Sequence, residues 1–158
     1  MIPFRFPYTR ISRPTDNLLL RYKNQPLLDV GLFNPRTDQL TKVEAFIDTG
    51  SQWCLFNKEY AEKIGIQNYR SKEYFQISGV GGPQANTAFF HDLDLIVYTN
   101  FRKLTIKEAI PIPTKIGFLE KDFGFGAILG VYGFLDHFSF LANIPQHYFE
   151  LTPQFGAP

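Results

Sequence analysis

The segment Ala45-Phe46-Ile47-Asp48-Thr49-Gly50-Ser51 places an acidic residue directly after three apolar residues. The apolar run is typical of a strand, and burying a carboxylate there is costly unless it is hydrogen-bonded or shares a proton. Asp-Thr-Gly is also good turn chemistry, because Asp bonds its own backbone and Gly accepts unusual backbone angles. Taken alone, the segment therefore fits an ordinary turn better than a reactive carboxylate.

The composition favours one sheet-rich domain. The chain has 158 residues, enough for one domain core and short for two. Aromatic residues make up 16% of it, and aromatic side chains pack well on pleated sheets. The 11 Pro and 12 Gly indicate many turns and argue against a helix bundle. Short strand-like runs between turn residues predict a mostly β fold, either a barrel or a sandwich.

Charge and residue spacing argue against several kinds of partner. The net charge is +1 and the basic residues are scattered, so we expect no nucleic-acid partner. No apolar stretch approaches the ~18 residues of a membrane span, and the first residues do not resemble a signal peptide, so we expect a cytoplasmic protein. The 3 His residues lack metal-ligand spacing, so we expect no metal site. Cys54, the only cysteine, is predicted to be a small core residue rather than a nucleophile.

Local patterns place the expected elements along the chain. We expect an irregular arm over 1–26 with one strand near 18–22, and a helix over 58–64 that Asn57 caps and Gly65 ends. A loop is expected over 111–125 and a helical turn over 134–140. The expected strands cover 27–33, 42–46, 74–77, 88–91, 93–98, 104–110, 127–129 and 148–151.

Two further motifs follow the Asp-Thr-Gly segment. Ile77-Ser78-Gly79-Val80-Gly81-Gly82 lies between two strand-like runs, and glycines at a hairpin tip can bring backbone N–H groups close to a ligand. By itself this motif fits an ordinary hairpin better than a binding element. Ala127-Ile128-Leu129-Gly130 by itself fits a buried strand that ends in a tight turn.

Together, the three motifs resemble in order and spacing the retropepsin-like aspartic peptidases, the single-lobed relatives of pepsin. Asp48-Thr49-Gly50-Ser51 resembles the catalytic turn of that family, 77–82 its glycine-rich flap, and Ile128-Leu129-Gly130 the apolar pair and glycine behind the turn. The resemblance implies a small closed β-barrel with a flap hairpin and one or two short helices. It divides the chain into an N-terminal arm at 1–26, a peptidase domain at 27–151 and a C-terminal tail at 152–158.

The resemblance also implies an activity and a partner. Since the chain has one Asp-Thr-Gly, a homodimer would pair two Asp48 carboxylates, which would activate a water for hydrolysis of a polypeptide substrate without a cofactor. Thr49 would bond across the dimer, and Gly50 would let the substrate backbone approach. Ser51 would donate a hydrogen bond to Asp48. The flap residues over the substrate would be Ser78, Gly79, Val80 and Gly81.

Two other functions stay open. Viral relatives carry an acidic residue and an arginine where this chain has Gln52 and Val131, so an ion pair that supports their dimer is missing. A non-catalytic peptide-binding or dimerisation module on the same fold is therefore an alternative. The other is a small β-barrel, such as a ligand carrier, in which Asp-Thr-Gly is coincidental. In that protein Asp48 would lie far from Gly130 and from the 78–82 hairpin.

Overall fold

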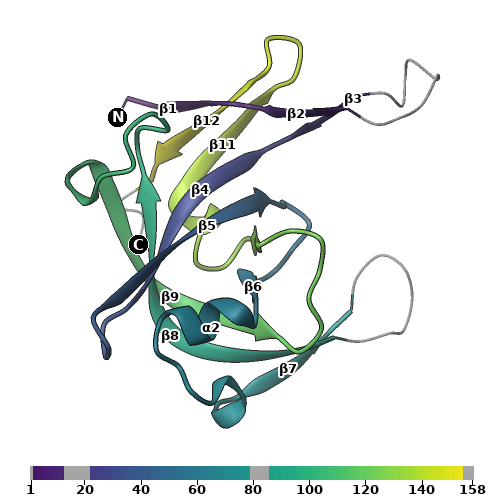
Figure 1. Cartoon of the computed structure of the whole chain (residues 1–158). Helices are drawn as coiled ribbons and strands as arrows, with labels where there is room; N and C mark the ends of the chain where they lie inside the picture. The colour runs from purple at the N-terminus through teal and green to yellow at the C-terminus, as the bar shows by residue number, and fades with distance from the viewer. Residues whose placement is uncertain (1, 13–21, 79–85, 155–158) are drawn as a thin grey trace.

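A closed β-barrel forms the body of the molecule (Figure 1). The computed structural model describes residues 2–12, 22–78 and 86–154. Six strands of these described segments follow one another in the order β4, β5, β10, β6, β9, β8, and β8 pairs again with β4. The predicted mostly β fold is confirmed, in its barrel form. The barrel strands are β4 (Leu27–Asn34), β5 (Gln39–Ile47), β6 (Leu55–Asn57), β8 (Asn86–Tyr98), β9 (Ala109–Leu119) and β10 (Ala127–Leu129).

Alternating burial fixes how β4 and β5 pair. In β5, Val43, Ala45 and Ile47 are buried, and the residues between them are not. The two strands form an antiparallel hairpin along the whole of β4. Because successive side chains point to opposite faces of a strand, a one-residue slip would turn the buried set towards solvent. The pattern therefore sets the register of the strand that leads into Asp48.

Short helical segments connect the strands. The α-helix α2 covers Glu59–Lys63, and the 3₁₀ turns η1, η2 and η3 cover Tyr69–Ser71, Ile106–Glu108 and Leu135–His137. Strand β7 (Tyr74–Ile77) pairs with the start of β8 and extends the sheet beside the barrel. None of the helices in the described segments has the length and apolar character of a membrane span.

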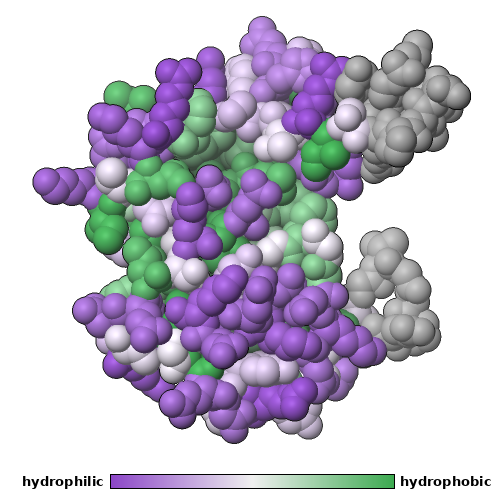
Figure 2. Space-filling model, viewed as in Figure 1, coloured by the Kyte–Doolittle hydropathy of each residue, from purple (hydrophilic) through white to green (hydrophobic). Residues whose placement is uncertain are grey.

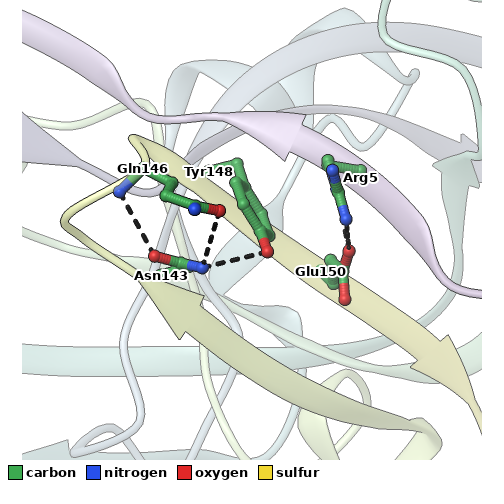
Figure 3. A network of polar contacts seen from close by, with 5 residues as sticks. All are labelled: Arg5, Asn143, Gln146, Tyr148 and Glu150. Carbon is green, nitrogen blue, oxygen red and sulfur yellow. Dashed lines mark hydrogen bonds and ion pairs between the residues drawn. The ribbon is translucent and has the colours of Figure 1, made fainter.

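The two ends of the chain meet in a second sheet. β1 (Phe4–Pro7) pairs with β12 (Tyr148–Pro153), which also pairs with β11 (Phe138–Asn143). Figure 3 shows Arg5 and Glu150, which lie opposite each other and form an ion pair of 2.6 Å. Arg5 Cζ also lies 4.0 Å from the centroid of the Tyr148 ring. These contacts hold the N-terminal strand on the C-terminal hairpin.

The segment 1–26 is more regular than its sequence indicates. β1 is followed by β2 (Thr9–Ser12), which pairs with β3 (Tyr22–Gln25). The strand forms because Phe6 is buried and stacks on Phe149 at 5.4 Å between ring centroids. The strand expected near 18–22 lies outside the described residues, except for Tyr22 at the start of β3. The division of the chain at residues 26 and 151 stays a prediction.

Two local expectations between residues 57 and 125 were wrong. Most of the loop expected at 111–125 belongs to strand β9, which runs to Leu119. Pro111 and Pro113 lie where one edge of β9 is unpaired, because β6 pairs only with residues 117–119. Proline lacks an N–H and is tolerated on such an edge. Asn57 does not cap α2. Its Nδ2 instead donates to Phe125 O over 2.8 Å, and its Oδ1 accepts from Phe123 N over 3.1 Å, which pins the loop before β10.

Two shorter expectations also differed from the structure. In place of the strand at 104–110, the chain forms η2 and enters β9 only at Ala109. The helical turn at 134–140 ends at His137, where β11 begins.

One core serves both sheets. Phe149 and Leu151 of β12 belong to the same buried cluster as Phe56 and Phe118 of the barrel. Figure 2 shows apolar side chains in a band between hydrophilic regions above and below it. The terminal sheet is therefore part of the same folded unit as the barrel strands. A smaller buried cluster, formed by Leu55, Ala88, Phe90 and Leu119, is separate from the main core.

Candidate functional site

Asp48 sits at the end of β5 and is anchored by the neighbouring strand β10. The two strands run parallel, with Leu129 paired with Ile47. The ladder continues one residue further, because the Asp48 N–H donates to Leu129 O over 3.0 Å. Asp48 is half-buried. Its backbone is therefore fixed while its side chain remains within reach of a ligand.

The Asp48 turn orients its own carboxylate. Gly50 N–H donates to Asp48 Oδ1 over 2.9 Å, and Ser51 N–H donates to Asp48 O over 3.1 Å. Within the described part of the chain, the other oxygen, Oδ2, makes no hydrogen bond. Thr49 and Gly50 are exposed. The Asp48 carboxylate thus lies on an accessible turn, with Oδ1 fixed by a backbone hydrogen bond and Oδ2 free to bind a ligand.

Gly130 allows the chain after β10 to lie against the turn. A Cβ at this position would lie 2.6 Å from Ser51 O and 2.8 Å from the carbonyl carbon of Trp53. The approach lets Val131 N–H donate to Ser51 O over 2.9 Å and Tyr132 N–H donate to Gln52 O over 3.0 Å. Two backbone segments, 51–53 and 130–132, are thereby tied together beside Asp48.

Ile128 and Leu129 face opposite sides of β10. Leu129 is fully buried in the main core behind the turn. Ile128 is half-buried and packs on the smaller cluster, together with Trp53, Ile77 and Phe123. The structure thus brings the predicted Ile128-Leu129-Gly130 motif beside Asp48, which the coincidental-turn alternative did not expect.

Ser51 does not donate to Asp48. Its Oγ donates to Trp53 O over 2.9 Å, and a hydroxyl has only one proton to donate. The turn already supplies a donor to the carboxylate through Gly50 N–H. The expected hydrogen bond from Ser51 to Asp48 was therefore wrong, and Ser51 instead holds the 51–53 segment.

The hairpin expected to carry the flap is described at its base only. Ile77 of β7 pairs with Asn86 of β8, and Ser78 follows β7 as an exposed residue. Gly79, Val80 and Gly81 lie outside the described residues. A flap that covers a substrate stays a prediction.

Two other reactive side chains, Cys54 and His91, have structural roles. Burial raises the pKa of Cys54 to about 12, and its Sγ donates to Tyr132 O over 3.4 Å. A thiol with that pKa is not a nucleophile at neutral pH. His91 lies 2.7 Å from Tyr69 O through Nε2, and burial lowers its pKa. Among the described residues, no group of His, Cys, Asp and Glu side chains is placed to hold a metal ion.

Comparison with known proteins identifies the fold of the chain. No protein-family model matches the chain, and no curated protein matches it. Its structure is similar to the crystal structure of a retropepsin-like aspartic protease from Rickettsia conorii, with a TM-score of 0.54 and 18% identity, over 90% of this chain and 97% of that chain. The fold is retropepsin-like.

Another solved structure that matches is the retroviral protease-like domain of Ddi1 from Leishmania major. It has a TM-score of 0.46 and 16% identity, over 82% of this chain and 94% of that chain. At these identities the similarity extends to the fold alone. The chemistry of its site therefore rests on its own residues.

Sequence reasoning missed a group of aromatic side chains beside the Asp48 turn. Trp53 contacts Phe75, Phe90 and Tyr132. These residues are far apart in the sequence and share no periodic pattern. An isolated parallel bridge between Trp53 and Tyr132, beyond Gly130, brings two of them together. The only early signal was Trp53 itself, an aromatic residue close after an Asp-Thr-Gly.

Proposed function

We propose that this chain is an aspartic endopeptidase whose active form is a homodimer. The observation that carries the proposal is the geometry of the Asp48 turn. Strand β10 holds the Asp48 backbone, Gly50 N–H holds Oδ1, and the turn is exposed at Thr49 and Gly50. The retropepsin-like fold around the turn supports the same function.

A second copy of the chain is needed because peptide hydrolysis requires two proton-handling groups. The sequence has one Asp-Thr-Gly. The next candidate, Asp136, is engaged elsewhere, because its Oδ1 accepts from Gly133 N–H over 3.1 Å at the start of η3. Two-fold symmetry would place two copies of the Asp48 turn face to face. Carboxylates about 3 Å apart cannot both ionise easily, so the pair shares one proton.

The reaction follows from this shared proton. The ionised Asp48 takes a proton from a water whose oxygen attacks the carbonyl carbon of the substrate. The protonated Asp48 donates a hydrogen bond to the carbonyl oxygen and stabilises its developing charge. Transfer of a proton to the amide nitrogen then breaks the C–N bond and releases the two products.

Three sets of neighbours have proposed supporting roles. Thr49 bonds to the partner's turn, and Gly50 gives the substrate backbone room. Leu129 and Gly130 keep the turn in place from behind. Ser78, with Gly79, Val80 and Gly81, covers the extended substrate through backbone hydrogen bonds.

Hydrolysis of unstructured polypeptides by the full chain tests the proposal. Asp48→Asn should lower the rate by about 10³-fold or more, because Asn cannot exchange the proton. A pepstatin-type transition-state mimic should block the activity of the parent chain. Asp136→Asn is the matched control, since it also changes an acid that accepts a backbone N–H. Equal rates for the parent and Asp48→Asn would refute the mechanism, and sedimentation at rising concentration would show whether two copies associate.

A non-catalytic peptide-binding module is the second candidate. Gln52 and Val131 are both uncharged residues, so neither supplies the ion pair that supports the dimer in viral relatives. A chain that stays monomeric at high concentration, binds extended peptides and cleaves none of them would select this function.

A further inference from the structure

A small cavity with acidic and aromatic walls lies between the barrel and the N-terminal strand β1. Its volume is about 150 Å³, and Asp48 does not line it. The barrel and the neighbouring segments contribute Phe6, Asp29, Glu44, Tyr98 and Phe101 to its walls. The two acids lie between core residues of β4 and β5, so their side chains point away from the barrel core. The cavity is therefore separate from the Asp48 turn.

Two carboxylates face each other across one wall of this cavity. Asp29 of β4 and Glu44 of β5 are directly paired in the antiparallel hairpin. Side chains at such positions have Cβ atoms about 4.5–5.5 Å apart, and like charges there repel each other. Within the described segments, neither carboxylate forms an ion pair or a hydrogen bond. The pair thus lowers the stability of the fold unless a cation lies between its members.

Tyr98 independently indicates a ligand in the same cavity. The residue is only 4% exposed, yet Tyr98 Oη makes no hydrogen bond within the part of the chain that the structure describes. It lies over β4, 3.0 Å from the position of a Cβ at Gly31, which is two residues from Asp29 on the same face. Burial raises the pKa of Tyr98, and the charge of Asp29 adds to this effect. A buried hydroxyl without a partner is rare, so its oxygen is available to a ligand beside the acidic pair.

The rest of the cavity favours an organic cation over a metal ion. Ca²⁺ takes about six to eight oxygen ligands, whereas the described residues contain no group of three or more His, Cys, Asp and Glu side chains placed to hold a metal. Phe6 and Leu27 give the cavity apolar walls. The ring of Phe101, which is 45% exposed, can attract a cation through its face. These walls fit a ligand that carries its charge on an aliphatic stem.

We propose that this cavity binds a primary ammonium group on an unbranched aliphatic stem, the chemistry shared by a lysine side chain and a free alkylamine. An ammonium has three N–H donors. They donate to the carboxylates of Asp29 and Glu44 and to Tyr98 Oη, while the stem packs on Phe6 and Phe101. Bonds of about 2.8 Å to each carboxylate match the spacing of two facing side chains. The inference does not rest on the proposed peptidase, because Asp48 takes no part in it.

Isothermal titration calorimetry of the full chain with n-butylammonium tests the charge and the donors. We expect one site per chain. n-Butanol has a similar stem without the charge, and tetramethylammonium has the charge without an N–H group. Each should bind about tenfold or more weakly than n-butylammonium, since hydrogen bonds to charged groups contribute an affinity of this order.

Three variants test the residues. Glu44→Gln should weaken n-butylammonium binding about tenfold, and it should fold at least as stably as the parent because it removes one of two facing like charges. Tyr98→Phe, which removes only the hydroxyl, should weaken binding about threefold or more. Glu73→Gln is the matched control, because Glu73 is an exposed glutamate that does not line the cavity. It should leave binding unchanged.

Several outcomes would overturn the inference. They are equal binding of n-butanol and n-butylammonium, equal effects of Glu44→Gln and Glu73→Gln, or complete displacement of n-butylammonium by an equal concentration of Ca²⁺. Nα-acetyl-lysine methylamide distinguishes the two sources of the ammonium. If it binds as tightly as n-butylammonium, the ligand is a lysine of a partner polypeptide, and if only n-butylammonium binds, it is a free amine. Hydrolysis by the parent and Asp48→Asn chains is measured separately, so either proposal can fail alone.

Discussion

Substituting Gly130 by alanine tests whether the close approach of β10 to the Asp48 turn is necessary. The new Cβ would meet Ser51 O at 2.6 Å and the Trp53 carbonyl carbon at 2.8 Å. Both are backbone atoms, so no side-chain rotation relieves the contact. Overpacking in a folded core typically costs about 1–3 kcal/mol, and we expect the upper end, about 3 kcal/mol.

Gly124→Ala provides a control with the same chemical change. Among the described residues, no atom lies within 4 Å of a Cβ built at Gly124. Neither glycine has the positive φ that would strain an alanine. Where the backbone is compatible, Gly→Ala stabilises by about 0.4–1 kcal/mol through the unfolded chain. The two variants therefore differ only in the space around the added methyl group.

Thermal and urea unfolding of both variants measure the difference. For a chain of this size, 1 kcal/mol corresponds to about 2–4 °C in Tm, so Gly130→Ala should melt about 6–12 °C below the parent. If the chain is the proposed peptidase, peptide hydrolysis should fall by about 10²-fold even where the variant is folded, because a displacement of about 1 Å at the turn misplaces Asp48. Equal melting temperatures for the two alanine variants would refute the role assigned to Gly130.

Three buried side chains outside the Asp48 turn give further tests. Because burial raises the pKa of Cys54 to about 12, the folded protein should resist thiol-specific alkylation at neutral pH and react only when denatured. Asn57→Ala should lower the free energy of unfolding by about 1–3 kcal/mol in urea, since it leaves backbone groups of the 123–125 loop unpaired. Burial lowers the pKa of His91 in the folded state, so the unfolded chain binds the proton more tightly, and stability should fall as the pH drops below about 6.5. His91→Gln should flatten this dependence in urea midpoints measured from about pH 7.5 to 5, whereas the same change at exposed His147 should not.

The strands β4 and β5 could be predicted because the information for them is local. The alternation of buried and exposed residues along β5 predicts a strand, and Asp48, which opens a turn, predicts where that strand ends. The Asn34-to-Asp38 turn joins two complementary strands, so their pairing needs no distant contact. The order of the three motifs then supplied the fold by resemblance.

The parts that could not be predicted depend on distant contacts. β1 forms because Phe6 meets Phe149, far away in the sequence. Two prolines made β9 resemble a loop, since the sequence does not reveal which strand edge stays unpaired. Ser51 had two acceptors within reach, and only the folded turn shows that Trp53 O receives its proton.

The pairing of β1 with β12 sets an order of events during synthesis. During translation β1 is synthesised first, whereas its partner β12 ends at Pro153. β1 therefore stays unpaired until almost the whole chain has been synthesised. The barrel strands can associate in the meantime, as their partners are already available. Completion of the terminal sheet is thus a late step. A stalled or shortened nascent chain would leave β1 unpaired, and an unpaired strand can pair with other chains and aggregate.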